Sequence, residues 1–131
     1  MTIDISGKVI QGDHYGRKIG YPTANIDRRD FIRRKIKVRL GVWAGTAKTA
    51  GSSKQKAVSY RAAIVIGPID KYRMPKIEAH LLNFKGNLYG KKITLTLIQY
   101  LRPFKKFTNE QSLKSQIKSD IEKIKSLNLN K

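Results

Sequence analysis

The chain contains no cysteine and only two histidines among its 131 residues. Disulfide bonds and thiolate metal sites are therefore excluded, and two isolated histidines cannot build a zinc cluster. No stretch approaches the roughly 18 consecutive apolar residues of a membrane span. The first residues also lack the basic flank and the apolar run of a signal peptide. We therefore expect a cytoplasmic protein without membrane association.

Acidic residues are scarce, because nine Asp and Glu stand against 28 Lys and Arg, which gives a net charge of +19. Between Arg28 and Arg39, seven of twelve residues are basic, a density that attracts polyphosphate backbones. A basic β-barrel that binds nucleic acid is therefore one alternative function. However, the charge is spread over the whole chain, aromatic residues make up only 8%, and no RNA-binding motif is present. We expect instead a solvated basic surface that attracts anionic nucleotides, with no nucleic-acid partner.

Most of the chain has the pattern of β-strands in one domain. A length of 131 residues suits an independent core, and we expect a single domain over residues 1–131. Short segments rich in β-branched and aromatic residues are separated by Gly, Ser, Asn and Pro. These segments are 6–12, 41–48, 56–67, 76–84 and 91–101. Residues 51–53 and 86–87 are predicted to be hairpin tips, and the alternation over 93–97 predicts a half-buried strand.

After Phe107 the hydrophobic period becomes that of a helix. The apolar residues on one stripe are Leu113, Ile117, Ile121 and Ile124. Thr108, with Gln111 three residues later, resembles a capping box and predicts a helix that starts near Asn109. Strands without intervening helices, followed by one helix, predict an antiparallel sheet with the helix packed on one side.

The segment 12–25 carries the strongest functional pattern. It joins a loop with three evenly spaced glycines to the tetrapeptide Pro-Thr-Ala-Asn, and such a loop can fold its N–H groups around an anion. Arg17 and Lys18 would add positive charge. Thr23 and Asn25 lie two residues apart, so on an extended segment their side chains leave one face about 6 to 7 Å apart, within reach of one small cation. The alternative is a surface β-turn before a short strand, and the known phosphate-loop motifs do not match.

Further motifs follow in a fixed order along the chain. They are Gly-Val-Trp-Ala at 41–44, Ile-Gly-Pro-Ile at 66–69, Ile-Glu-Ala-His-Leu-Leu-Asn-Phe at 77–84, Leu-Tyr-Gly at 88–90 and Tyr-Leu-Arg-Pro at 100–103. Together with Pro-Thr-Ala-Asn, this series resembles the bacterial-type riboflavin kinase (flavokinase) family from about Gly7 to Ile124. The resemblance implies a mainly β fold, a six-stranded antiparallel Greek-key β-barrel with a C-terminal α-helix. Trp43, where Tyr is usual, and Phe104, where an acidic residue is common, depart from the family pattern.

The resemblance also implies an activity, an ATP-dependent transfer of phosphate to riboflavin that gives FMN and ADP. Thr23 and Asn25 would hold Mg²⁺, and Glu78 would act as the catalytic base. The residues expected to contact ATP are Gly12, Tyr15, Arg17, Gly20, Tyr21, Thr23, His80, Asn83 and Tyr89. Those expected to contact riboflavin or FMN are Arg102, Lys105 and Phe107. We expect a monomer, and a monofunctional kinase, because no adenylyltransferase domain precedes residue 1.

Each of these residues also has a structural alternative. A strand carboxylate is usually an exposed charge, but Glu78 shares a strand face with His80, Leu82 and Phe84, and apolar surroundings would raise its pKa toward that of a useful base. His80 could be a strand histidine with a satisfied hydrogen bond, and Tyr89 a core aromatic residue. A flavin-binding relative without catalysis is a third functional class, which the presence of Glu78, Thr23 and Asn25 disfavours.

Overall fold

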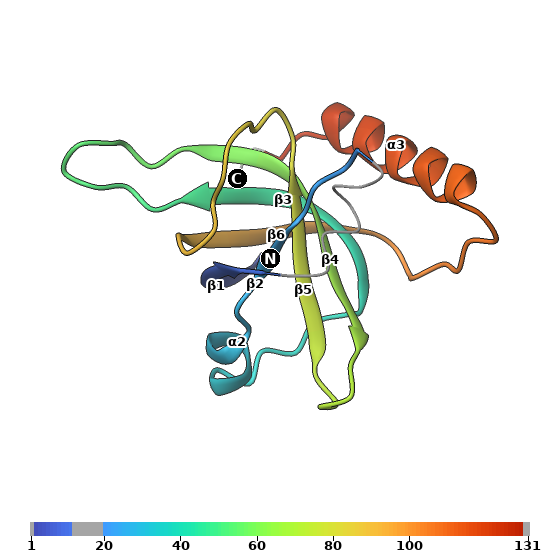
Figure 1. Cartoon of the computed structure of the whole chain (residues 1–131), viewed down its shortest axis with the longest axis horizontal. Helices are drawn as coiled ribbons and strands as arrows, with labels where there is room; N and C mark the ends of the chain where they lie inside the picture. The colour runs from blue at the N-terminus through green and yellow to red at the C-terminus, as the bar shows by residue number, and fades with distance from the viewer. Residues whose placement is uncertain (1, 12–19, 130–131) are drawn as a thin grey trace.

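A computed structural model describes residues 2–11 and 20–129 of the chain. Six strands form a closed antiparallel barrel in the order β1-β2-β5-β4-β3-β6 (Figure 1). The strands are β1 (Ile3–Ile10), β2 (Ala24–Ile26), β3 (Gly41–Thr49), β4 (Ser59–Ile69), β5 (Pro75–Leu81) and β6 (Lys92–Arg102). The expected six-stranded Greek-key barrel is therefore confirmed.

The strands alternate between the barrel interior and its outer surface, as β6 illustrates. Ile93, Leu95 and Leu97 are at most 1% exposed and belong to the barrel core, whereas Thr94 Oγ1 lies 2.9 Å from Ser6 Oγ on the neighbouring strand. The predicted period-2 strand is thus confirmed. Gly45 lets β3 approach β6 closely, because a Cβ atom at this position would lie 1.9 Å from the carbonyl oxygen of Thr96.

A short helix between β2 and β3 was not expected from the sequence pattern. Helix α2 (Arg29–Arg33) lies at the lower end of the barrel in Figure 1. Its Phe31 is 6% exposed and joins the barrel core. The expectation that helix is confined to the end of the chain is therefore wrong, because one apolar anchor among basic residues gives no helical period.

Helix α3 (Glu110–Ser126) packs against the outer surface of the barrel, as predicted (Figure 1). Its N-cap is Asn109, whose side chain accepts a hydrogen bond from the Ser112 N–H at 2.8 Å. The predicted start is correct, but the cap is Asn109 and not Thr108. Near the other end of α3, Arg61 on β4 donates to the carbonyls of Ile124 and Leu127 at 2.5 and 2.6 Å.

Two apolar clusters hold these elements together. One fills the barrel, and the second lies between the barrel surface and the C-terminal half of α3. The second cluster consists of Ala44, Ala63, Leu82, Ile124 and Leu129, with Ile98, Leu101, Ile121 and Leu127 packed against it. Within the described part of the chain, no helix has both the length and the apolar character needed to cross a membrane.

The segment 86–87 is not a hairpin tip. Strand β5 pairs with β2 and β4, and β6 pairs with β1 and β3, so the loop after β5 crosses to a strand that is not its neighbour. Local turn residues cannot distinguish such a crossing from a hairpin. The crossing matters because this loop borders a cavity.

Candidate active site

The antiparallel pair β2 and β5 brings the predicted metal ligands and the predicted base together. Asn25 lies directly opposite Glu78, and Ala24 opposite Ala79. Ala79 is 1% exposed and belongs to the barrel core, so Asn25 and Glu78 extend from the outer surface of the barrel. Because side chains alternate along a strand, His80 lies on the same surface as Glu78.

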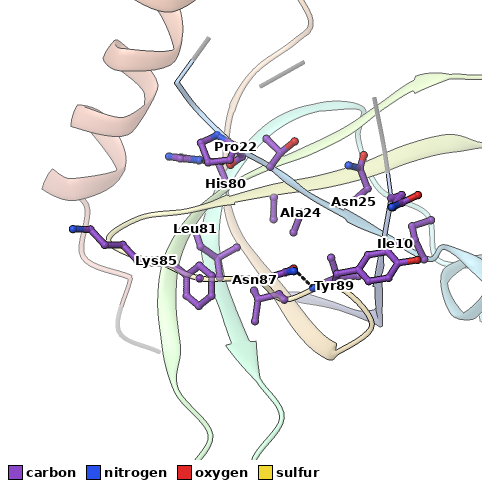
Figure 2. A pocket seen from close by; sticks show the side chains of 16 residues that line it. Ile10, Pro22, Ala24, Asn25, His80, Leu81, Lys85, Asn87 and Tyr89 are labelled. Atoms are coloured by element: carbon purple, nitrogen blue, oxygen red, sulfur yellow. Dashed lines mark hydrogen bonds between the residues drawn. The ribbon is translucent and has the colours of Figure 1, made fainter. Parts of the chain in front are cut away.

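A first cavity of about 570 Å³ opens beside this strand pair. Four segments line it, namely 9–11, 22–25, 79–81 and 84–89 (Figure 2). Figure 2 shows Pro22 close to His80 at one end and Tyr89 beside Ile10 at the other. The Tyr89 side chain is 57% exposed, and its backbone N–H donates to Asn87 Oδ1 at 2.8 Å. The cavity is lined by both apolar and polar side chains, a combination that suits a nucleotide.

A second cavity of about 380 Å³ lies between the outer surface of the barrel and α3. Its apolar lining includes Val42, Val65, Phe104, Phe107, Leu113 and Ile117, and its acidic and basic lining residues are Lys76, Glu78, His80, Arg102, Lys105 and Asp120. Gly67, with φ at +108°, allows the Phe104 ring to lie against the backbone, because a Cβ atom there would lie 2.6 Å from the ring. A flat aromatic ligand fits such walls.

Thr23 and His80 line both cavities. Asn25 lines only the first cavity and Glu78 only the second, although the two face each other across the strands. The two cavities therefore meet at Thr23 and His80, with a carboxylate on one side and an amide on the other. At this junction, a chemical group could be transferred from a ligand in one cavity to a ligand in the other.

The orientation of His80 is fixed by its neighbours. Its Nδ1 lies 2.7 Å from the carbonyl oxygen of Pro22, and because a carbonyl only accepts, Nδ1 carries the proton. The ring of Tyr21 packs edge-on against His80, with the ring centroids 5.9 Å apart. His80 thus has the satisfied hydrogen bond expected of a purely structural strand histidine, and it also lines both cavities.

Arg102 is held by a partner that the sequence does not reveal. Its Nε donates to both carboxylate oxygens of Asp120 at 3.0 and 3.2 Å, and its Nη2 donates to Oδ2 at 2.7 Å. Asp120 is 7% exposed and also accepts from Gln116 Nε2 at 3.0 Å. The predicted residues Lys105 and Phe107 line the same cavity.

Several residues that we expected to contact ATP do not line the first cavity. Tyr21 lines the second cavity and not the first. Asn83 is exposed and lines neither cavity, and its φ of +61° turns the chain directly after β5. This turn ends the strand alternation, so Phe84 packs against the barrel core and not on the surface of Glu78. Gly20 lines neither cavity, and Gly12, Tyr15 and Arg17 lie outside the described residues.

The sequence pattern also misses part of the site. Leu113 and Ile117 belong to the predicted apolar stripe of the helix, but they line the second cavity, whereas Ile121 and Ile124 pack on the barrel. Ile10 lines the first cavity without any motif that marks it, and Leu88 lines it although only its motif neighbour Tyr89 was assigned to a site. The helical stripe was the available signal, but a stripe does not tell a packed surface from a cavity wall.

The two predicted cation ligands, Thr23 and Asn25, are neutral. Over residues 2–11 and 20–129, no three His, Cys, Asp or Glu side chains gather into a group that could bind a metal. The hydroxyl of Thr23 and the amide oxygen of Asn25 leave a single cation with few protein ligands. Such a donor set suits Mg²⁺, which keeps several waters and takes the remaining ligands from phosphates.

Comparisons with known proteins agree with this architecture. The chain is 40% identical over 125 residues to the bifunctional riboflavin kinase/FMN adenylyltransferase of Buchnera aphidicola subsp. Schizaphis graminum. The aligned region covers 92% of this chain and 37% of that protein. The chain thus spans about a third of the length of the bacterial relatives it matches. It is 31% identical to human riboflavin kinase over 121 residues, which covers 91% of the chain and 76% of the human protein.

The fold has a solved counterpart as well. The crystal structure of riboflavin kinase from Trypanosoma brucei superposes with a TM-score of 0.71 at 24% identity, covering 95% of this chain and 78% of that one. Residues 1–128 match the flavokinase family, described as riboflavin kinase. The chain therefore belongs to the riboflavin kinase family.

Proposed function

We propose that the chain transfers the γ-phosphate of ATP to the 5′-hydroxyl of riboflavin, giving FMN and ADP. The observation that carries the proposal is the junction of the two cavities at Thr23 and His80. ATP would occupy the first cavity with its phosphates toward the junction. Riboflavin would occupy the second, with its ribityl chain directed to the same place.

Glu78 is the proposed base. It lines the second cavity, where the ribityl hydroxyl would lie, and faces the position of the γ-phosphate across the strand pair. The hydroxyl oxygen attacks the γ-phosphorus and forms a new P–O bond while the bond to the β,γ-bridging oxygen breaks. The hydroxyl proton passes to the Glu78 carboxylate, and ADP leaves. The protein contributes mainly alignment and charge stabilisation, as is general for phosphoryl transfer.

Thr23 and Asn25 are the proposed protein ligands of Mg²⁺. Their side chains present neutral oxygens at the phosphate end of the first cavity. When bound, Mg²⁺ neutralises negative charge on the phosphate oxygens. The fixed strand pairing of Asn25 with Glu78 keeps this ligand and the base in register.

The isoalloxazine ring is proposed to lie between the barrel surface and α3. Phe104, Phe107, Leu113 and Ile117 supply apolar walls, and Arg102 and Lys105 supply positive charge at the rim. An aromatic ring or a guanidinium group can stack on a flavin. The segment 103–107 would then cover the ring and limit access of water to the transferring phosphate.

The basic segment 28–39 gives little support to a nucleic-acid-binding function. Arg28 pairs with Asp70, and Arg29 with Asp27, both at 2.6 Å. Arg33 and Arg34 both pair with Asp30. Arg39 lies over the ring of Tyr100 at 4.0 Å from its centroid. Five of the seven basic residues in this segment are therefore engaged within the protein, and kinase activity remains the proposal.

We also propose that residues 1–131 form one domain that acts as a cytoplasmic monomer. One barrel core joined to α3 by an adjoining cluster supports a single folding unit. Light scattering after size-exclusion chromatography would measure the mass directly. A mass near 14.9 kDa is expected, and a multiple of it would contradict the monomer.

The first test is detection of FMN by chromatography after incubation with riboflavin, ATP and Mg²⁺. Glu78→Gln is assayed beside the wild type under the same conditions. We expect FMN from the wild type and a strong reduction in the variant. The absence of FMN from folded wild-type protein, with ATP or another nucleoside triphosphate, would overturn the proposed function.

A further inference from the structure

The ion pair between Arg102 and Asp120 joins the last residue of β6 to the middle of α3. Both residues line the second cavity, and three hydrogen bonds of 2.7 to 3.2 Å connect them. The segment 103–107 lies between them in the chain. The ion pair therefore links β6 and α3, the two elements that flank this segment in the chain.

Asp120 is unusual in its burial. Among the described residues it is the only charged side chain that is buried, at 7% exposed. A buried ion pair is weak support for stability, because desolvation offsets much of the attraction. Its position in a cavity wall suggests that Asp120 orients another group there. Gln116, one helical turn earlier, holds Asp120 in turn.

The bonds to Asp120 determine which donors of Arg102 remain for a ligand. A guanidinium group has five N–H donors in a fixed plane. Within the described residues, Nε and one N–H of Nη2 point to Asp120, and one N–H of Nη1 points to the carbonyl oxygen of Pro103 at 3.2 Å. One N–H on each terminal nitrogen is left. Both donors belong to the guanidinium group of Arg102, which lines the second cavity.

We propose that Asp120 is a positioning residue for riboflavin, which fixes the guanidinium of Arg102 so that its remaining N–H groups meet acceptor atoms of the flavin ring. The inference rests on the proposed function, since it assigns the second cavity to riboflavin. Asp120 acts through Arg102 and does not itself bind the substrate. Its loss leaves Arg102 in the cavity wall but free to rotate.

A purely structural role for Asp120 predicts a different outcome. In that case Asp120 would hold α3 to the barrel, and any loosening of the helix would have the same effect. Arg61 provides the matched control, because it donates to the carbonyls of Ile124 and Leu127 at the C-terminal end of α3. Arg61 lines neither cavity.

The experiment compares Asp120→Ala, Arg102→Ala, the double variant and Arg61→Ala. The readouts are the KM values for riboflavin and for ATP, and riboflavin binding followed by quenching of flavin fluorescence. We expect Asp120→Ala to raise the riboflavin KM about 10- to 100-fold, the effect of losing hydrogen bonds to a charged group, with the ATP KM within about twofold. Asp120→Asn, which keeps the shape and one acceptor oxygen, should lie between this variant and the wild type.

The double variant decides between the two roles. If Asp120 acts through Arg102, adding Asp120→Ala to Arg102→Ala leaves the riboflavin KM unchanged. Additive effects of the two substitutions, or an equal increase in KM for Arg61→Ala, would overturn the inference. So would an unchanged riboflavin KM in both Asp120 variants. Failure of the wild type to form FMN would instead reject the proposed function itself.

Discussion

Asn25 on β2 and Glu78 on β5 lie directly opposite each other across an antiparallel strand pair. Side chains in such a pair have Cβ atoms only about 4.5 to 5.5 Å apart. The proposed metal ligand and the proposed base are therefore held in register by backbone hydrogen bonds and not by a loop.

Glu78→Gln should lower kcat by a factor on the order of 10² to 10⁴, the usual contribution of a general base. The variant keeps the size and polarity of the side chain, so both substrates should still bind. Steady-state kinetics and flavin fluorescence measure the two properties separately. Glu122→Gln, an exposed position on α3, is the matched control. Normal turnover in Glu78→Gln would remove Glu78 from the role of base.

Thr23→Ala should raise the KM for Mg·ATP at least about 10-fold, because even indirect metal contacts are worth 10- to 100-fold in metal affinity. Thr23→Ser retains the hydroxyl oxygen and should stay close to the wild type. Titration of Mg²⁺ at fixed ATP concentration gives the measurement. Equal behaviour of the Ala and Ser variants would mean that the hydroxyl holds no cation.

Gly67→Ala should weaken riboflavin binding and lower stability. The residue has φ at +108°, and the new methyl group would meet the ring of Phe104 at 2.6 Å. Backbone strain costs about 1 to 2 kcal/mol, and displacement of Phe104 removes a wall of the second cavity.

Gly90→Ala separates these two effects. Gly90 has φ at +80°, and nothing lies within 4 Å of an added Cβ atom. This variant should lose stability but keep the riboflavin KM of the wild type. An increased KM in both variants would trace the effect to strain and not to Phe104.

Asn109→Ala should lower the free energy of unfolding by about 1 kcal/mol, the usual cost of removing an N-cap side chain. The melting temperature should fall by about 3 to 5 °C for a domain of this size. Thr108→Ala should change stability by less than about 0.5 kcal/mol, since the cap bond to Ser112 comes from Asn109. A larger loss for Thr108→Ala would restore Thr108 as the cap.

Periodic patterns predicted the long elements of the fold, because packing on one surface imposes its period on the sequence. The alternation over 93–97 and the helical stripe after residue 107 are examples. Strand β2 has only three residues, too few for a period. The sequence also did not show which strands pair. The loop after β5 resembled a hairpin turn, although it leads to β6, which does not pair with β5.

The residues of the candidate site also fall into those that motifs predicted and those that motifs did not predict. Thr23, Asn25, Glu78 and His80 stand in motifs, and the last three lie on the pair of β2 and β5, with Thr23 directly before β2. Asp120 was missed because its partner Arg102 is 18 residues away, and nothing in the helix sequence distinguishes it from a solvent-exposed acid. Tyr21 and Asn83 were expected to contact ATP, but neither lines the first cavity, because the lining depends on loop geometry that motifs do not determine.

The separation of the two apolar clusters implies that the two proposed substrates would depend on regions of unequal local stability. The first cavity is lined by barrel strands and loops, and no described residue of α3 contributes to it. The second needs Leu113, Ile117 and Asp120. Because a peripheral helix can open without global unfolding, amide hydrogens of α3 should exchange before those of the barrel. Mild denaturant should then abolish flavin affinity first and leave a folded barrel that still holds nucleotide.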